Sequence, residues 1–257
     1  MSDLFDIGPE GHEPRDPMRS AEAARPLPKR FYTDASYALG EDGAFAILLD
    51  GKAVKTPAKR RLAVAREAVA AAIAAEWAAQ GALIDPATMP LTRLANSAID
   101  GVASNAAAVR AEILNYAGSD LLCYRAGDPE RLVQLQDAAW NPLIDWMHER
   151  FGARFLLAEG IIHVEQFPET IAAVDAALGE PGPLELAGLS TINTLTGSAI
   201  LTLAVLHGRL TAAEAWAAAH VDEDFEISLW GEDDEAMRRR AARWREMQAA
   251  AEVLGRN

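Results

Sequence analysis

The chain changes the period of its apolar residues once, close to Pro57, and this change constrains the fold more than any other feature. Before Pro57, short runs with strand character over 31–38, 44–49 and 52–56 are separated by the turn sequences GEDG (40–43) and Asp50-Gly51. After Pro57, apolar residues recur every three to four positions, which predicts helices. We therefore expect an α+β fold, with a small β-rich N-terminal domain followed by a larger, mainly helical C-terminal domain.

Proline, glycine and capping residues divide the chain further. Residues 1–28 hold several Pro and Gly residues and almost no apolar periodicity, which predicts a flexible tail. We expect a β-rich domain with one helix over 29–88 and a helical domain over 89–257. The expected helices lie over 65–80 with Gly81 as the stop, after a cap at Asn105, from Pro129 with a kink or break at Pro142, over 168–178 and 197–207, from the Thr211/Glu214 capping box to about Trp230, and over 233–254.

Composition and charge exclude several classes of function. A formal net charge of −14 over 257 residues argues against binding nucleic acid, and the arginines of RRRAARWR (238–245) are expected on a solvated helix face. The longest apolar run, 199–206, is too short to cross a bilayer, so no membrane insertion is expected. A single cysteine, Cys123, fits a reducing, cytosol-like compartment and is expected to be a buried apolar residue.

The sequence holds no strong catalytic or metal-binding motif. There is no glycine-rich phosphate loop and no GxSxG elbow. His163-Val164-Glu165 lacks the PCxxC partner of a zinc deaminase, and His220 beside Asp222 and Asp224 is expected at the surface rather than on a metal. We therefore predict a protein that is not an enzyme and uses no cofactor or metal.

The stretch MPLTRLANSAID (89–100) has an unusual polar face. If it is helical, Thr92, Asn96 and Asp100 share one face, with Arg93 beside them. Short hydrogen-bonding side chains are not typical of a solvated face, so we expect these four residues to join the two domains, with Arg93 as a planar fork. Direct contact with a partner and a catalytic Arg93–Asp100 pair remain as alternatives.

A second unusual stretch, HVDEDFEISLWGEDDE, carries eight acids. We place Asp222, Glu223, Asp224 and Glu226 near the end of a helix, where the dipole disfavours anions. The buried stripe of that helix is expected to be Ala218, Val221, Phe225 and Leu229. An acidic row that ends in Trp230 indicates a surface for a basic and apolar partner. The alternative is a solvated acidic row with Trp230 packed into the domain.

Several stretches together resemble a known family. They are LDGKAVKTPAK (49–59), AAEWAAQ (74–80), IDPATMPLTRLANSAID (84–100), YAGSDLLCYRA (116–126), QDAAWNPLIDW (136–146) and the WG at 230–231. The chain, over about residues 29–250, resembles the F-type ATP synthase assembly chaperones specific for the α subunit of the catalytic sector, the mitochondrial assembly factor 2 type with its α-proteobacterial relatives.

The resemblance implies an ATP-independent chaperone that binds the free α subunit and prevents its aggregation before assembly with β. We expect a monomer in the bacterial cytoplasm, where eukaryotic relatives act in the mitochondrial matrix. The family's sensitive acid lies in the helix just before the WG, which implies that Asp222 or Glu223 fills this role here, although this chain departs from the family, which favours Glu over Asp and has Gln at the position of Glu226. Together with the acidic row, this gives Asp222, Glu223, Glu226, Trp230 and Gly231 as the expected partner-binding residues. Two alternatives remain: a hydrolase or other enzyme using Arg93, Asp100 and the acidic cluster, and an adaptor for a different client.

Overall fold

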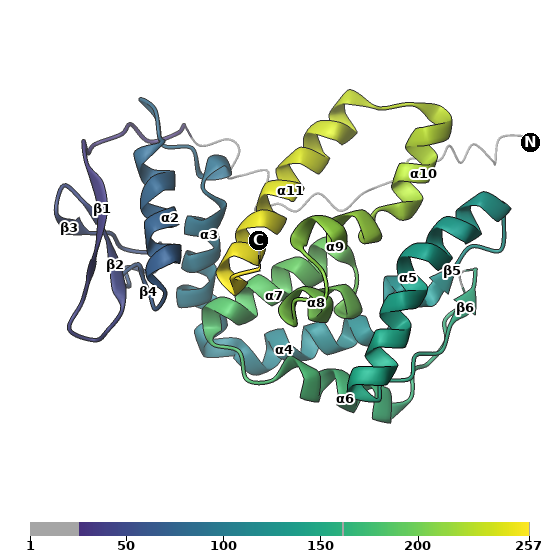
Figure 1. The fold of residues 1–257 in the computed structure, drawn as a ribbon. Helices are drawn as coiled ribbons and strands as arrows, with labels where there is room; N and C mark the ends of the chain where they lie inside the picture. Colours follow the sequence, from purple (N-terminus) through teal and green to yellow (C-terminus); the bar gives the residue numbers. More distant parts are fainter. Residues whose placement is uncertain (1–25, 161, 257) are drawn as a thin grey trace, which may run out of the picture.

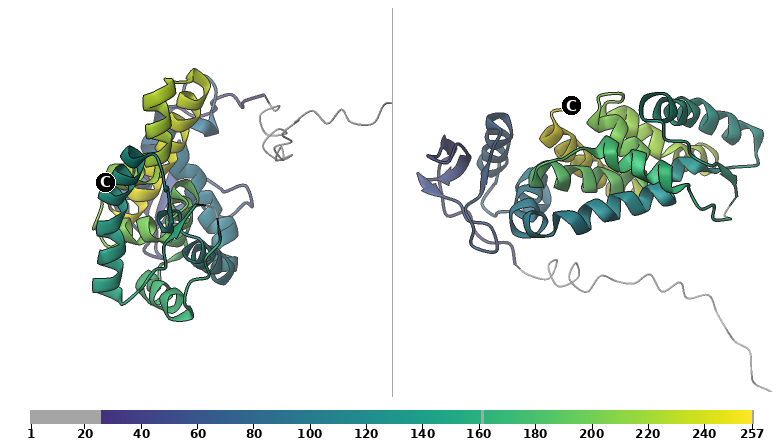
Figure 2. Two further views of the ribbon diagram at one scale, coloured as in Figure 1. Left: turned by 90° about the vertical axis from the view of Figure 1, so that its right-hand side faces the viewer. Right: turned by 90° about the horizontal axis from the view of Figure 1, so that it is seen from below.

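The computed structural model describes residues 26–160 and 162–256, and it is α+β as predicted. A small antiparallel sheet lies at one end and a helical body makes up the rest (Figure 1). Figure 2 shows the molecule from two further sides, and its right-hand view has the sheet and helix α2 at one end and helix α5 at the other. Most of the tail predicted over 1–28 lies outside the described residues.

The sheet contains the predicted three-stranded meander, with a shorter third strand than the predicted 52–56 and a fourth strand, after Pro57, that the sequence did not predict. Strands β1 (Ala35–Leu39) and β2 (Phe45–Leu49) pair in antiparallel register, β3 (Lys52–Ala53) pairs with β2, and β4 (Ala63–Val64) pairs with the other end of β2. Asp50 and Gly51 both have positive φ, 47° and 76°, as a two-residue hairpin turn requires. The first strand begins later than predicted because the carboxylate of Asp50 accepts hydrogen bonds from the backbone N–H groups of Thr33 and Asp34.

Helix α2 (Glu67–Ala78) packs against this sheet through Val69, Ala70 and Ile73. It ends at Ala79, before the predicted stop at Gly81. Beyond it the chain turns back, and Ile84 N donates to Pro28 O at 2.8 Å. Pro28, which belongs to the tail predicted over 1–28, is therefore bonded to the N-terminal domain.

The stretch MPLTRLANSAID forms α3 (Pro90–Ser97) and a π-helical segment, η2 (Ala98–Val102), which continues into α4 (Ala103–Gly118). Asn105 was expected to begin a new helix, and its backbone angles, φ −132° and ψ 27°, are not helical, so α4 kinks at this residue. Its Nδ2 donates to Gly101 O. Helix α5 (Glu130–Phe151) passes through Pro142 without the break that the sequence allowed.

The remaining elements differ from the sequence analysis in two places besides the region of His220: helix α7 (Pro183–Thr196) forms where no helix was predicted, and two short strands pair in parallel within the helical part. Helix α6 (Pro168–Leu178) ends at Gly179, and the Thr211/Glu214 capping box opens its helix as predicted. The helix expected to run from there to Trp230 is two helices, α9 (Ala212–Ala219) and α10 (Val221–Trp230). The fold also contains η1 (Pro86–Thr88), η3 (Leu121–Cys123), β5 (Tyr124–Arg125), β6 (Ala158–Glu159), α7 (Pro183–Thr196), α8 (Ala199–Leu206) and α11 (Asp234–Leu254).

His220 separates α9 from α10, and it is buried rather than at the surface as expected. Its ring stacks on Trp216 with centroids 4.0 Å apart, and its Nδ1 lies 2.7 Å from Trp216 O. Its backbone angles, φ −115° and ψ 20°, are not helical. Burial lowers the pKa of His220, so the ring is neutral at pH 7.

Two groups of buried side chains form the core. One group crosses the boundary between 88 and 89, because Ile47 and Ile73 belong to the same cluster as Leu91, Ala95 and Met247. The other surrounds α8, all of whose residues except the last are buried, and includes Trp140, Leu189 and Cys123. Burial raises the pKa of the Cys123 thiol, which therefore stays protonated, as expected of a buried apolar residue.

Candidate partner-binding surface

The acids of the predicted row begin a helix instead of ending one. Asp222, Glu223 and Asp224 lie in the first turn of α10, because the chain breaks at His220. The positive end of the helix dipole stabilises anions there. The helix dipole therefore favours these acids, contrary to the expectation from the sequence, and gives no reason to assign them to partner binding.

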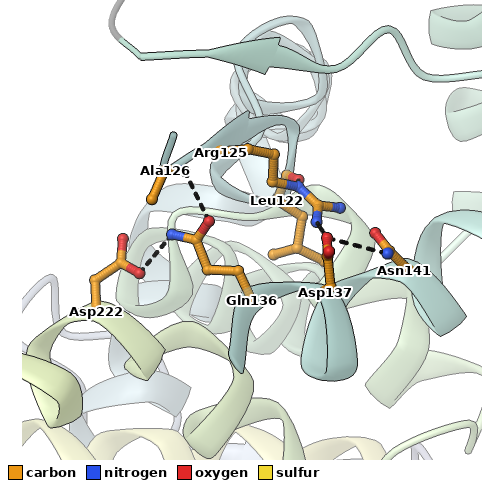
Figure 3. A network of polar contacts seen from close by, with 7 residues as sticks. All are labelled: Leu122, Arg125, Ala126, Gln136, Asp137, Asn141 and Asp222. Carbon is orange, nitrogen blue, oxygen red and sulfur yellow. Dashed lines mark hydrogen bonds and ion pairs between the residues drawn. The ribbon is translucent and has the colours of Figure 1, made fainter. Parts of the chain in front are cut away.

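Asp222 connects α10 to the body of the protein (Figure 3). Its Oδ1 accepts a hydrogen bond of 2.7 Å from Nε2 of Gln136 on α5. Gln136 is buried, and its own Oε1 accepts from Ala126 N at 2.8 Å. One buried amide thus fixes α10 and the chain just after β5 to α5. We call this pair of hydrogen bonds the Gln136 clasp.

Arg125 lies beside the Gln136 clasp and joins β5 to α5. Its Nε donates to Leu122 O at 2.8 Å and its Nη1 to Asp137 Oδ1 at 3.2 Å, and Asn141 also donates to that oxygen (Figure 3). The guanidinium lies 5.3 Å from the centroid of a ring of Trp140. These contacts hold β5 against the part of α5 to which Asp222 bonds. A binding residue at the surface is positioned more precisely when the elements around it are held in this way.

The other three acids of the row differ from one another. Asp224 forms an ion pair of 2.5 Å with Arg240 on α11, and this bond raises the pKa of Arg240. Arg240 is largely buried, so it departs from the solvated face expected at 238–245. Glu223 lies 3.7 Å from His220 Nε2, but the neutral ring makes this a weak contact rather than an ion pair. Glu226 is exposed.

The end of α10 presents apolar side chains to solvent. Trp230 is 86% exposed and Leu229 is 53% exposed, while Phe225 is buried. Leu229 is thus outside the buried stripe to which the sequence analysis assigned it, and a Trp230 packed into the domain is excluded. Gly231 ends the helix with φ 87° and ψ 179°, a conformation nearly restricted to glycine, so its presence in the WG pair has a backbone cause.

An apolar groove runs beside α10, between it and α5, with α9 as the floor. Its volume is about 630 Å³. Leu135 on α5 is 42% exposed and belongs to one wall. The lining consists of Arg131, Leu135, Ala138, Ala139 and Leu143 from α5, Leu210, Glu214, Ala217 and Ala218 from α9 and the turn before it, and Val221, Asp224, Phe225 and Ser228 from α10. Sequence periodicity could not find this groove, because it depends on how α5 and α10 pack.

The second predicted set of residues lies elsewhere, at the junction of α2 and α3. Thr92 is buried, and its Oγ1 donates to Glu76 Oε2 at 2.7 Å. The backbone N–H groups of Leu91 and Thr92 donate to the two oxygens of the same carboxylate at 2.7 and 2.8 Å. Glu76 therefore caps the start of α3 from another helix, and burial raises its pKa. The sequence analysis did not single out Glu76, since a lone Glu in an Ala-rich helix gives no signal for capping.

Asp100 also contacts the N-terminal part of the chain. Its two oxygens accept from Thr56 Oγ1 at 2.6 Å and from Ala58 N at 2.9 Å, and the bond from Thr56 lowers its pKa. Arg93 instead pairs with Glu246 on α11 at 3.0 Å and is partly exposed, so it is not the fork between the domains that we expected. Asn96 is half-buried and its Oδ1 is a buried atom with no hydrogen-bond partner among the described residues.

Arg93 and Asp100 bond to different segments, and within the described chain no hydrogen bond or ion pair joins them. In the same residues, no three His, Cys, Asp or Glu side chains come together as metal ligands. None of the helices that the structure describes combines the length and the apolar character needed to cross a bilayer. What the geometry offers is a surface of acidic and exposed apolar groups around α10, beside an apolar groove.

Comparisons with known proteins agree with this picture. The family model described as "ATP12 chaperone protein" matches residues 29–148. The mitochondrial protein atp12 of Schizosaccharomyces pombe is 23% identical over 233 residues, which cover 84% of this chain and 80% of that protein.

Solved structures give closer matches. The Atu1473 protein of Agrobacterium tumefaciens, a candidate chaperone, is 49% identical and superposes with a TM-score of 0.86 over 95% of this chain and 92% of its own. Atp12 from Paracoccus denitrificans is 41% identical with a TM-score of 0.81, over 89% of this chain and 97% of its own. With this identity over nearly the whole length, the chain belongs to the ATP12 chaperone family.

Proposed function

We propose that this protein is an ATP-independent assembly chaperone of the bacterial cytoplasm, which binds the unassembled α subunit of the F-type ATP synthase and prevents its aggregation until it joins β. The proposal rests on the exposed apolar side chains at the end of α10, in a chain that belongs to a chaperone family. There Trp230 is 86% exposed and Leu229 is exposed beside it, next to a row of carboxylates.

The chemistry of this surface suits a protein client. Tryptophan is among the residues that contribute most to protein interfaces, and a fully solvated one on a monomer has no packing role. Glu223 and Glu226 lie on the same short helix as Trp230, and carboxylates beside an aromatic anchor favour a client with basic groups around an apolar patch. In this proposal Glu226 and Trp230 contact the client. Asp222 attaches α10 to α5, and Gly231 terminates α10.

The alternatives from the sequence are less well supported. An enzyme would need acids and bases that converge in a pocket, but Arg93 and Asp100 contact different segments and the apolar groove holds few polar groups. An adaptor for another client would use the same surface, so only a binding experiment separates it from the proposal.

The test is an aggregation assay without nucleotide. Unfolded α subunit is diluted from denaturant with and without the chaperone, and light scattering is recorded. We expect suppression at stoichiometric chaperone, co-elution of the two proteins in size exclusion, and no binding to α already assembled with β. Light scattering on the eluting peak also checks that the free chaperone is a monomer. Separate elution of α and chaperone across protein concentrations and salt would overturn the proposal.

A further inference from the structure

We propose that the groove between α5 and α10 binds one amphipathic helix of the client, with the apolar face of that helix on Leu135 and its basic residues facing the carboxylates of α10. This inference rests on the proposed function and deepens it, because it names the site and the kind of client segment that occupies it.

The lining of the groove sets the chemistry of its occupant. Nine of the thirteen lining residues, all but Arg131, Glu214, Asp224 and Ser228, are Ala, Leu, Val or Phe. Three of the four polar side chains already have partners, since Glu214 bonds to Thr211, Asp224 pairs with Arg240, and Ser228 Oγ donates to Phe225 O. The inner part of the groove therefore offers apolar contact, and an occupant gains from burying apolar side chains there.

The walls of the groove favour a helix over an extended strand. All three elements that form it, α5, α9 and α10, are helices, so no sheet edge is present to pair with an incoming strand. A strand would leave its own N–H and C=O groups without partners against an apolar wall, which costs free energy. A helix satisfies these groups internally. The ten residues of α10 extend for roughly 15 Å, which matches two to three turns of a helix laid beside it.

The charge of α10 favours a basic client segment. The helix carries four carboxylates and no Lys or Arg. Asp224, the one acid of the row that lines the groove, is paired with Arg240. The other three acids lie on the same helix outside the lining, and among the described residues none of them forms an ion pair with an arginine. Leu229 and Trp230 do not line the groove, but both are exposed at the end of the same helix. The groove itself is therefore apolar, and a basic residue at the edge of its occupant would meet carboxylates on the neighbouring faces of α10.

The Gln136 clasp keeps this groove open to a fixed width. Gln136 holds Asp222 on α10 to α5, while the Asp224–Arg240 pair holds α10 to α11 from the other side. A preformed groove binds with less loss of conformational freedom than one that must open. The occupant that we propose therefore docks onto a wall that is already positioned.

The experiment tests binding after a large side chain has been placed in the groove. Ala138 is exposed on the α5 wall, and Ala138→Trp places an indole in the groove. Ala107→Trp, at an exposed alanine of the long helix α4, is the matched control. Fluorescent peptides, each one helix of the α subunit, are titrated with wild type and both variants by anisotropy, and intact α subunit is tested in the aggregation assay. Thermal melts check that each variant is folded; if Ala138→Trp does not fold, Leu135→Ala replaces it.

We expect a peptide with apolar residues at i, i+3, i+4 and i+7 and flanking Lys or Arg to bind wild type and Ala107→Trp alike. Binding to Ala138→Trp should be at least about tenfold weaker, with a parallel loss of protection of the intact subunit. If Ala138→Trp protects the α subunit as well as wild type does, the groove inference is wrong while the proposed function stands. If wild type itself does not bind the α subunit, the proposed function fails first. Dimerisation of wild type that Ala138→Trp abolishes would assign the groove to a second copy of this chain.

Discussion

The side chains of Gln136 and Asp222 form a hydrogen bond of 2.7 Å although 86 residues separate them in the chain. Gln136 is buried, whereas the residue at 222 is exposed, so the bond connects the core to the acidic row. One oxygen of Asp222 is occupied by this contact. A substitution at 222 therefore changes both the charge of the surface and the attachment of α10, and the two effects can be separated.

Asp222→Asn should still suppress most of the aggregation of the α subunit, because the amide oxygen can still accept the hydrogen bond from Gln136. Asp222→Ala should lose more protection, since it removes the acceptor. The measurement is light scattering of diluted α subunit with each variant at equal concentration. Equal, severe defects in both variants would show that the charge of Asp222 matters and the attachment does not.

Gln136→Leu removes the other partner of the same bond without touching the surface. It leaves Ala126 N without its acceptor, and we expect the free energy of unfolding in urea to fall by about 1–3 kcal/mol. Client protection should weaken although Gln136 is buried and out of reach of a client. Full protection at a temperature where the variant is folded would rule out a positioning role for the Gln136 clasp.

Reversal of the acids at the start of α10 should destabilise the protein. In the double variant Asp222→Lys, Glu223→Lys, two cations replace anions in the first turn, at about 0.3–1 kcal/mol each, in addition to the lost bond from Gln136. Glu226→Lys lies beyond that turn and is the control, with little expected change in melting temperature. A double variant that melts at or above the wild-type temperature would contradict this use of the dipole.

The sequence predicted what depends on local rules. The Asp50-Gly51 turn, the Thr211 capping box and the Asp233 start of the last helix each need only neighbouring residues, and the structure has all three. The break at His220 could not be predicted in this way, because no Gly or Pro marks it and the stacking on Trp216 appears only once α9 has folded. Its consequence was large, since it moved the acidic row from the end of one helix to the start of another.

The α2–α3 junction shows the same limit for long-range contacts. Thr92 and Asp100 do bond to the N-terminal part of the chain, as expected from their short polar side chains, but the partners, Glu76 and Thr56, could not be identified from spacing. Arg93 was assigned the same role and instead bonds to Glu246, more than 150 residues away. A helix face can be recognised from sequence, whereas the element that covers it cannot.

Trp230→Ala should separate binding from folding. The indole is almost fully solvated, so its removal should change the free energy of unfolding by less than about 0.5 kcal/mol. Affinity for the α subunit, measured by fluorescence titration, should fall at least about tenfold if Trp230 is a binding hot spot. The matched control is Phe31→Ala, at another exposed aromatic residue in the N-terminal part. Unchanged affinity would remove the tip of α10 from the binding surface.

The α2–α3 junction should depend on Glu76 far more than on Arg93. Glu76→Ala leaves the N–H groups of Leu91 and Thr92 without acceptors, and we expect a loss of about 1–3 kcal/mol per buried group left unpaired. Arg93→Ala removes a partly exposed ion pair, which contributes less than about 1 kcal/mol. Urea unfolding of the two variants compares them directly. A larger loss from Arg93→Ala would show that its pairing with Glu246 supports the fold.

Asp120 gives the stability of this protein a pH dependence of predictable sign. The side chain is fully buried, and its two oxygens accept from Leu122 N and Ile200 N, each at 3.0 Å, so that it ties the η3 turn to the start of α8. Burial raises its pKa from 3.8 to about 6, against the opposing effect of the bond from Ile200. Because the folded state holds this proton more tightly than the unfolded chain, the contribution of Asp120 to stability is full below pH 3.8 and is lost as pH rises through about 6.

The measurement compares wild type with Asp120→Asn, which does not titrate and loses one acceptor at every pH. Other carboxylates titrate alike in both proteins, so the difference between their free energies of unfolding isolates Asp120. From about pH 4 to about pH 7, the advantage of wild type over Asp120→Asn should shrink by about 2 kcal/mol, which is most of the effect expected for this pKa shift at 1.36 kcal/mol per unit. An advantage that grows with pH would mean that the hydrogen bonds from Leu122 and Ile200 outweigh burial and hold the carboxylate ionised.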